Sequence, residues 1–167
     1  MKKDTLEPTA LEKAMTYLSR RGHSEAELSA KLHRAGFGRF EISHALEECR
    51  RLGLVNDELF ARDCAEMLAM RGCGNYRIRR DLAKRGVAEF APEAIEELSE
   101  SESLRALEAA RFKLRLLCRE SDPRKKREKL YRFLAGRGFA PVSIRQALDR
   151  LRAEEEHPEL ADEEPDL

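Results

Sequence analysis

The apolar residues of the chain follow a short sequence pattern that occurs three times, which we call the repeated phrase. An aliphatic residue is followed four positions later by a second aliphatic residue and, after four more, by glycine. The copies are Leu28, Leu32, Gly36; Ile78, Leu82, Gly86; and Leu130, Leu134, Gly138. From Leu28 to Ile78 is 50 positions, and from Ile78 to Leu130 is 52. A repeat of this period predicts tandem modules rather than one large core.

Each copy lies between two further segments with apolar residues at helical spacing, so the repeating unit consists of three helices. Helix-start signals support this unit, because Ser24 precedes Glu27 in a capping-box pattern and Asp122 precedes Pro123. We therefore predict an all-α protein, in which three tandem three-helix modules form an elongated repeat. The sequence leaves open whether the molecule is a crescent or a compact bundle.

The same pattern bounds the modules. We predict a first module with an N-terminal extension at residues 1–54, a second module at 55–100, a third at 101–153 and an acidic tail at 154–167. The tail contains two prolines and few apolar residues, so it is expected to be disordered. Modules of this size bury too little surface to be very stable alone, so neighbouring modules are expected to pack on each other.

Two local details of the helices are also predicted. The first helix is expected over residues 9–21, with Met15 among its inward-facing side chains. In the second module, the run Gly72, Cys73, Gly74 ends one helix, and Asn75 is expected to cap the next.

Charge is distributed unevenly, although the formal net charge is zero. From Glu154 onward there are eight acidic residues and no Lys or Arg, which leaves 32 basic against 24 acidic residues in the rest of the chain. The body therefore carries about +8 before the tail is counted. A basic surface of this kind attracts phosphates or acidic protein faces.

Little in the chain supports catalysis or metal binding. The four histidines are scattered, and none occurs with a nucleophile and a carboxylate in a triad order. The cysteines lack CxxC spacing, and Cys49 and Cys64 fall on apolar helix faces, as buried free thiols in a reducing cytosol would. No apolar run is long enough for a membrane span, and no signal peptide is evident. We predict a non-enzymatic cytoplasmic protein that has no cofactor or metal and is a monomer.

Basic residues, in contrast, show an ordered spacing. Arg77, Arg80 and Lys84 project from one side of their predicted helix, opposite its apolar residues. A shift of 52 positions maps two of them onto Lys129 and Arg132, and Lys125 shares that face. We call these six residues the basic face and predict that it binds a partner. The alternative is that any exposed helix of a charged protein carries Lys and Arg.

Two further features limit the kind of partner. The third helices of the first two modules carry clusters of glutamate, which phosphates would repel, so sequence-specific operator binding by a helix-turn-helix is not expected. The acidic tail has two interpretations. It either keeps the protein soluble or folds back on the basic face and competes with an anionic partner.

The middle of the chain closely resembles the central motif of the RecX regulators of bacterial recombination. The matching residues are Asp57, Glu58, Leu59, Phe60, Ala61, Arg71, Gly74, Arg77, Ile78, Leu82, Ala83, Lys84, Arg85, Gly86 and Val87. A second set resembles the first module of that family: Leu18, Ser19, Arg20, Arg21, Ser24, Glu27, Leu28, Lys31 and Leu32. The resemblance extends over about residues 10–152 and leaves out the acidic tail.

The resemblance implies a cytoplasmic, non-enzymatic helical protein that acts in DNA recombination, repair and the SOS response. It implies binding to the RecA filament on single-stranded DNA, with inhibition of its ATPase and strand-exchange activities, and in some members direct DNA binding. No catalytic residue is implied. Among the matching residues, Phe60 and Ile78 are expected to be apolar core residues, and Gly86 is expected to end a helix. Such residues would hold the surface in shape without contacting the partner.

Two other functions remain compatible with the residues. A non-sequence-specific DNA-binding helical module would bind naked DNA as strongly as a filament and would affect a recombinase only by competition for DNA. A helical scaffold for an unrelated protein would bind neither.

Overall fold

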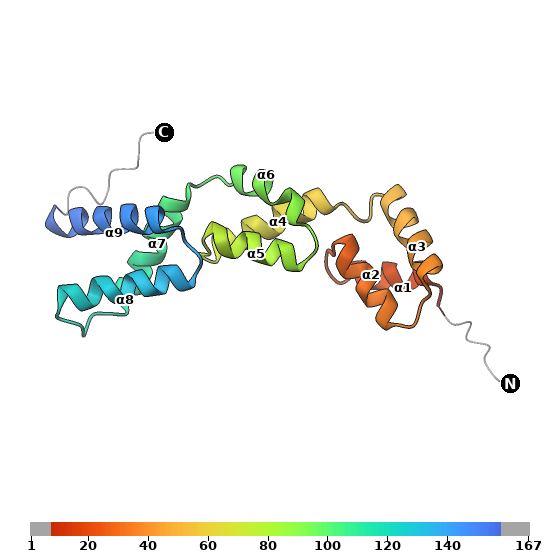
Figure 1. Cartoon of the computed structure of the whole chain (residues 1–167), viewed down its shortest axis with the longest axis horizontal. Coiled ribbons are helices and arrows are strands. Elements are labelled where there is room, and N and C mark those ends of the chain that lie inside the picture. The colour runs from red at the N-terminus through yellow and green to blue at the C-terminus, as the bar shows by residue number, and fades with distance from the viewer. Residues whose placement is uncertain (1–7, 158–167) are drawn as a thin grey trace. The chain divides into compact units, whose positions relative to one another are not determined.

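The computed structural model describes residues 8–157, and this part of the chain is all-α, as predicted (Figure 1). It contains nine α-helices and one short 3-10 helix, without a strand. The helices are α1 (Ala10–Leu18), α2 (Glu25–Arg34), α3 (Arg39–Arg51), α4 (Asp57–Met70), α5 (Asn75–Lys84), η1 (Ala88–Phe90), α6 (Ala91–Glu96), α7 (Glu102–Arg115), α8 (Pro123–Gly136) and α9 (Pro141–Glu156).

The described residues divide into two compact units, each with its own core. The first unit comprises residues up to 64 together with 81–94, and the second comprises 65–80 together with the residues from 95 onward. In the first unit, α1, α2 and α3 pack together around buried Leu28, Leu32 and Ile42. In the second, α7, α8 and α9 enclose Leu130, Leu134 and other buried residues. The paired leucines of the repeated phrase are thus core residues in both units.

Helix ends follow the local signals in the sequence. Ser24 accepts a hydrogen bond from the Glu27 amide at the start of α2, and Asp122 caps α8, whose first residue is Pro123. All three glycines of the repeated phrase have a positive φ, which glycine adopts at little cost at the end of a helix. The sequence therefore predicts these boundaries from capping chemistry alone.

Three local predictions differ from the structure. α1 ends at Leu18 rather than near residue 21, because the hydroxyl of Ser19 turns back to the Thr16 carbonyl. Met15 is 46% exposed, since Ala10 and Ala14 form the buried side of this short helix. Asn75 is not the cap but the first residue of α5.

The first residues of the predicted acidic tail are helical. α9 continues to Glu156 and so includes the first three residues of the predicted tail. Glu154 pairs with Arg111 of α7 at 2.6 Å, which fixes the end of α9 against α7. Residues 158–167, which carry the rest of the predicted tail, lie outside the described residues.

We refer to α1–α3, α4–α6 and α7–α9 as the first, second and third helix groups. Within the first unit, the start of α2 receives the turn that follows α5. The Ser24 hydroxyl donates to the Arg85 carbonyl, and the Asp57 carboxylate accepts from the Glu25 amide at 2.8 Å. Gly86 lies so close that a Cβ on it would be 2.3 Å from the Ala26 Cβ. This is the junction of the first and second groups.

The second unit contains a junction built at matching positions. The Gly74 amide donates to the Arg137 carbonyl at 3.0 Å, and the Glu102 carboxylate accepts from the Asn75 amide at 2.6 Å. A Cβ on Gly138 would lie 2.6 Å from the Arg77 nitrogen. Adding 50 to Ser24 gives Gly74, and adding 52 to Arg85 gives position 137, so the register of the repeated phrase is also the register of the junctions.

The first glycine of the phrase has a different environment. Gly36 has a φ of +95°, yet no described atom beyond its chain neighbours lies within 4 Å of the position that a Cβ would take. Within the described residues, the turn at Gly36 takes part in no junction of the kind that Gly86 and Gly138 form. The three copies therefore share a helix end but only the second and third also serve in packing between groups.

Candidate functional site

Helix α5 presents three of the six residues of the basic face. Its Ile78 and Leu82 are fully buried, so the opposite side of the helix faces solvent. Arg77, Arg80 and Lys84 lie on that side and are exposed. No ion pair among the residues that the structure describes neutralises them. The α5 part of the basic face thus carries three uncompensated positive charges.

The amino end of this basic helix is held by a buried polar cluster in the second unit. Arg105 of α7 is 6% exposed and donates to the Cys73 carbonyl at 2.9 Å and to the Asn75 side chain at 2.6 Å. Glu102 accepts from the Asn75 amide and from the Ser143 hydroxyl. Burial lowers the pKa of Arg105, but a guanidinium starts so high that it remains charged. These bonds fix the direction in which α5 leaves its turn.

Helix α8 carries the other three residues of the basic face, and two of them form ion pairs with carboxylates. Lys125 is exposed and forms no ion pair within the described residues, although its charge contributes to lowering the pKa of Glu120. Lys129 contacts Glu120 at 2.5 Å, and this hydrogen bond is the largest cause that lowers the pKa of Glu120. Arg132 pairs with Glu128 one turn earlier at 3.2 Å. The α8 part therefore offers less free charge than the α5 part.

Two further residues extend the α5 part of the face. Tyr76 is 57% exposed and Arg79 is exposed, and both border the side of the helix that carries Arg80. The sequence prediction missed Tyr76 because it considered only Lys and Arg, and it missed Arg79 because this residue lies on the flank of the helix rather than opposite Ile78 and Leu82. The same angular spacing of about 100° per residue would have found them as neighbours. An exposed aromatic ring among arginines is also suited to stack on a nucleobase.

Arg85, which belongs to the family-like motif, has a structural position instead. It pairs with Asp81 at 2.7 Å and with Glu27 at 3.1 Å, at the junction within the first unit. The side-chain hydrogen bond to Asp81 is the largest cause that raises the pKa of Arg85. Arg85 therefore connects the groups and is unavailable to a partner without breaking these pairs.

Groups suited to other chemistry are sparse in the described region. Three of the four cysteines, Cys49, Cys64 and Cys73, are buried free thiols, and burial raises the pKa of Cys49 and of Cys64. Between residues 8 and 157 no cluster of three His, Cys, Asp or Glu side chains could hold a metal ion. Over the same range, no helix is both long and apolar enough to cross a membrane.

Comparison with known proteins gives consistent matches along the chain. Residues 10–49 match the family model for the first three-helix domain of RecX, and residues 101–148 match the model for its third three-helix domain. The regulatory protein RecX of Chlorobium phaeobacteroides is 36% identical over 150 residues, which cover 89% of this chain and 97% of that protein. RecX of Prosthecochloris aestuarii is 36% identical over 144 residues, with 85% and 93% covered.

A solved structure shares the fold. The crystal structure of RecX from Lactobacillus salivarius superposes with a TM-score of 0.76 and covers 86% of this chain and 95% of that one. The identity between the two sequences is 22%, so this likeness concerns the fold alone.

Proposed function

The chain belongs to the RecX family of regulatory proteins, and on this basis we propose that it binds the filament formed by the RecA recombinase on single-stranded DNA and inhibits ATP hydrolysis and strand exchange there. It would act in the cytoplasm as a monomeric regulator of recombination and repair within the SOS response, without a cofactor or metal of its own. The three predicted modules at 1–54, 55–100 and 101–153 would be its working units.

The uncompensated charge of α5 is the observation that carries this proposal. Arg77, Arg80 and Lys84 stand on a helix whose amino end is fixed by hydrogen bonds from Asn75 to Glu102 and from Arg105 to Asn75, so they are presented in a defined direction. A filament of protein on DNA offers phosphates and acidic side chains at regular intervals. Several modest contacts made by one chain then add through a high effective concentration.

Charge reversal of the α5 part tests the proposal. We expect the triple variant Arg77→Glu, Arg80→Glu, Lys84→Glu to lose most of its inhibition of RecA ATPase on single-stranded DNA while its helical circular dichroism stays unchanged. Binding by the wild type should weaken steeply between about 50 and 200 mM salt if phosphates are contacted, and less in the variant.

A matched variant controls for net charge. Arg20→Glu, Arg39→Glu and Arg115→Glu change the same number of exposed basic residues away from the basic face. This control should inhibit like the wild type. Full inhibition by the α5 variant would refute the role of the basic face. The non-sequence-specific DNA-binding function would be favoured instead if the protein bound naked DNA as tightly as the filament. In that case it would lower RecA ATPase activity only by competing for DNA.

A further inference from the structure

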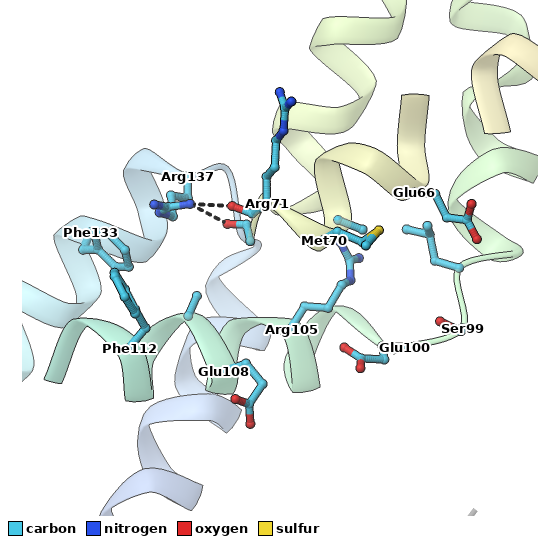
Figure 2. A pocket seen from close by; sticks show the side chains of 14 residues that line it. Glu66, Met70, Arg71, Ser99, Glu100, Arg105, Glu108, Phe112, Phe133 and Arg137 are labelled. Carbon is cyan, nitrogen blue, oxygen red and sulfur yellow. Dashed lines mark hydrogen bonds between the residues drawn. The ribbon is translucent and has the colours of Figure 1, made fainter. Parts of the chain in front are cut away.

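The second unit contains an open pocket with a volume of about 790 Å³ that the basic face does not use. Its walls come from the end of α4, the segment before α7, one side of α7 and the end of α8 (Figure 2). Figure 2 shows Phe112, Phe133 and Arg137 at one end, Glu66 and Glu100 at the other, and Arg105 between them. None of the six residues of the basic face lines it.

Apolar side chains in this pocket are unusually exposed. Met70 is 88% exposed at the last turn of α4, and Phe112 is 53% exposed on α7. Both line the pocket together with Phe133. Flexible thioethers and aromatic rings in a concave site are the side chains that commonly anchor a partner's apolar side chain. The pocket thus has apolar side chains that the described chain leaves open to solvent.

The two ends of the pocket carry charges of opposite sign. Arg137 donates to the backbone carbonyls of Arg71 and Gly72, and its guanidinium lies 4.7 Å from the centre of the Phe133 ring. Its bonds go to neutral groups, so its charge is not neutralised there. At the opposite end, Glu66 and Glu100 form no ion pair with any described residue, although the charge of Glu100 acts on Arg105 and raises its pKa. Arg137 and Glu66 are therefore each available for a side chain of the opposite sign.

The floor adds a further positive charge. The Arg105 side chain is almost completely buried, its two hydrogen bonds reach uncharged acceptors, and its Nε has no partner among the described residues. Glu102 and Glu100 offset part of this charge, so an anionic group entering beside Arg137 would be stabilised by the remainder without contacting it.

We propose that the pocket holds a segment of a partner protein that inserts an apolar side chain between Met70 and Phe112, with an acidic side chain toward Arg137 and a basic one toward Glu66 and Glu100. This rests on the proposed function, and the segment then belongs to RecA itself rather than to its DNA. The lining supports a protein, because its arginines are accompanied by the carboxylates of Glu66 and Glu100, whereas a third lining glutamate, Glu108, is paired with Arg111. A chain of phosphates would be repelled by those carboxylates.

Truncation of the two apolar anchors tests the pocket. The double variant Met70→Ala, Phe112→Ala should weaken binding to the RecA filament about tenfold or more and leave binding to naked single-stranded DNA unchanged. Both side chains are largely exposed, so the fold should persist, as a thermal melt would verify. Leu116→Ala is the matched control, because Leu116 is 61% exposed near the same helix but does not line the pocket.

Several outcomes would overturn the pocket proposal. If the double variant inhibits the filament as the wild type does, the pocket is not used, while the proposed function stands. If naked DNA binding falls in parallel, the occupant is nucleic acid. If removal of residues 158–167 abolishes the difference between variant and wild type, the chain's own end is the occupant. If the wild type neither binds nor inhibits the filament, the proposed function itself is wrong.

Discussion

Single buried polar residues set how this fold responds to pH, and His23 is an instructive case. It is 3% exposed, and its Nδ1 lies 2.9 Å from the Arg21 carbonyl. A carbonyl only accepts, so Nδ1 carries the proton of the neutral ring, and Nε2 has no partner within the described residues. Burial is the largest cause that lowers the pKa of His23 below 6.5. The fold therefore favours neutral His23.

This burial predicts an acid-sensitive first unit. Because the folded pKa is lower than the unfolded one, the unfolded chain binds more protons and the free energy of unfolding decreases as pH falls below about 6.5. Urea unfolding at several pH values between about 7.5 and 5 should show this slope. His23→Gln should remove it, whereas His33→Gln, which changes an exposed histidine, should retain it. An unchanged slope in His23→Gln would contradict the assignment.

At the residue scale, helical spacing predicted the buried aliphatic residues of the repeated phrase and the exposed positions of α5, but not the ion pairs. Sequence reasoning selected the six residues of the basic face from helical spacing, and all three on α5 are exposed and unpaired within the described part of the chain. It could not foresee that Lys129 and Arg132 pair with Glu120 and Glu128. Nor could it find Arg105, since a lone arginine in an amphipathic helix gives no sign that it will be buried against a distant turn.

Among the elements, the turns between helices carry the constraints that hold the groups together. Gly74 shows this most directly, because its φ is not in the positive range that favours glycine. A Cβ there would lie 2.2 Å from the Phe139 nitrogen and 2.3 Å from the Gly138 carbonyl carbon. Those are backbone atoms, which cannot move aside as the end of a flexible side chain can. Gly74 is thus required by the close approach of two turns.

Substituting two glycines should separate packing from backbone strain. Gly74→Ala is expected to destabilise the second unit by about 3 kcal/mol or more, because two backbones would be forced apart. Gly36→Ala should cost only about 1–2 kcal/mol, because it strains a positive φ in open space. Urea denaturation monitored by circular dichroism would compare them. Equal losses would show that the junction tolerates the extra methyl group.

Helix existence and type were predictable from apolar spacing, and most helix starts were predictable from capping residues. The errors lie where a neighbouring group decides. Asparagine is a residue type that commonly caps helices. In this structure, however, the Asn75 amide donates to Glu102, and its side chain accepts a hydrogen bond from Arg105. The helix therefore begins one residue earlier than predicted. Contacts between segments that are 27 and 30 positions apart leave no local trace in the sequence.

For the whole molecule, the segregation of charge along the chain is the dominant property. Residues 158–167 contain five carboxylates, Glu159, Asp162, Glu163, Glu164 and Asp166, and no basic residue. Glu154, in contrast, is committed to Arg111 and belongs to the folded part. A truncation that probes the acidic end should therefore begin after residue 157, so that the helix end is left intact.

Removing residues 158–167 should raise affinity for an anionic partner. The deletion makes the chain five charges more positive, which strengthens attraction at low ionic strength and accelerates association. The gain should disappear near 1 M salt, where the screening length is about 3 Å. Filament binding measured at two salt concentrations would check this. A deletion that changes nothing at low salt would assign the acidic end to solubility alone.

The matching of the two junctions also bears on how such a chain can evolve. Ser24 and Gly74 occupy one register position, and each receives the turn that ends the middle helix of the following group. A duplication or loss of one whole group would therefore recreate a junction of the existing kind, whereas an insertion inside a group would shift its register. Gene duplication in this family should consequently change chain length in steps of about 50 residues.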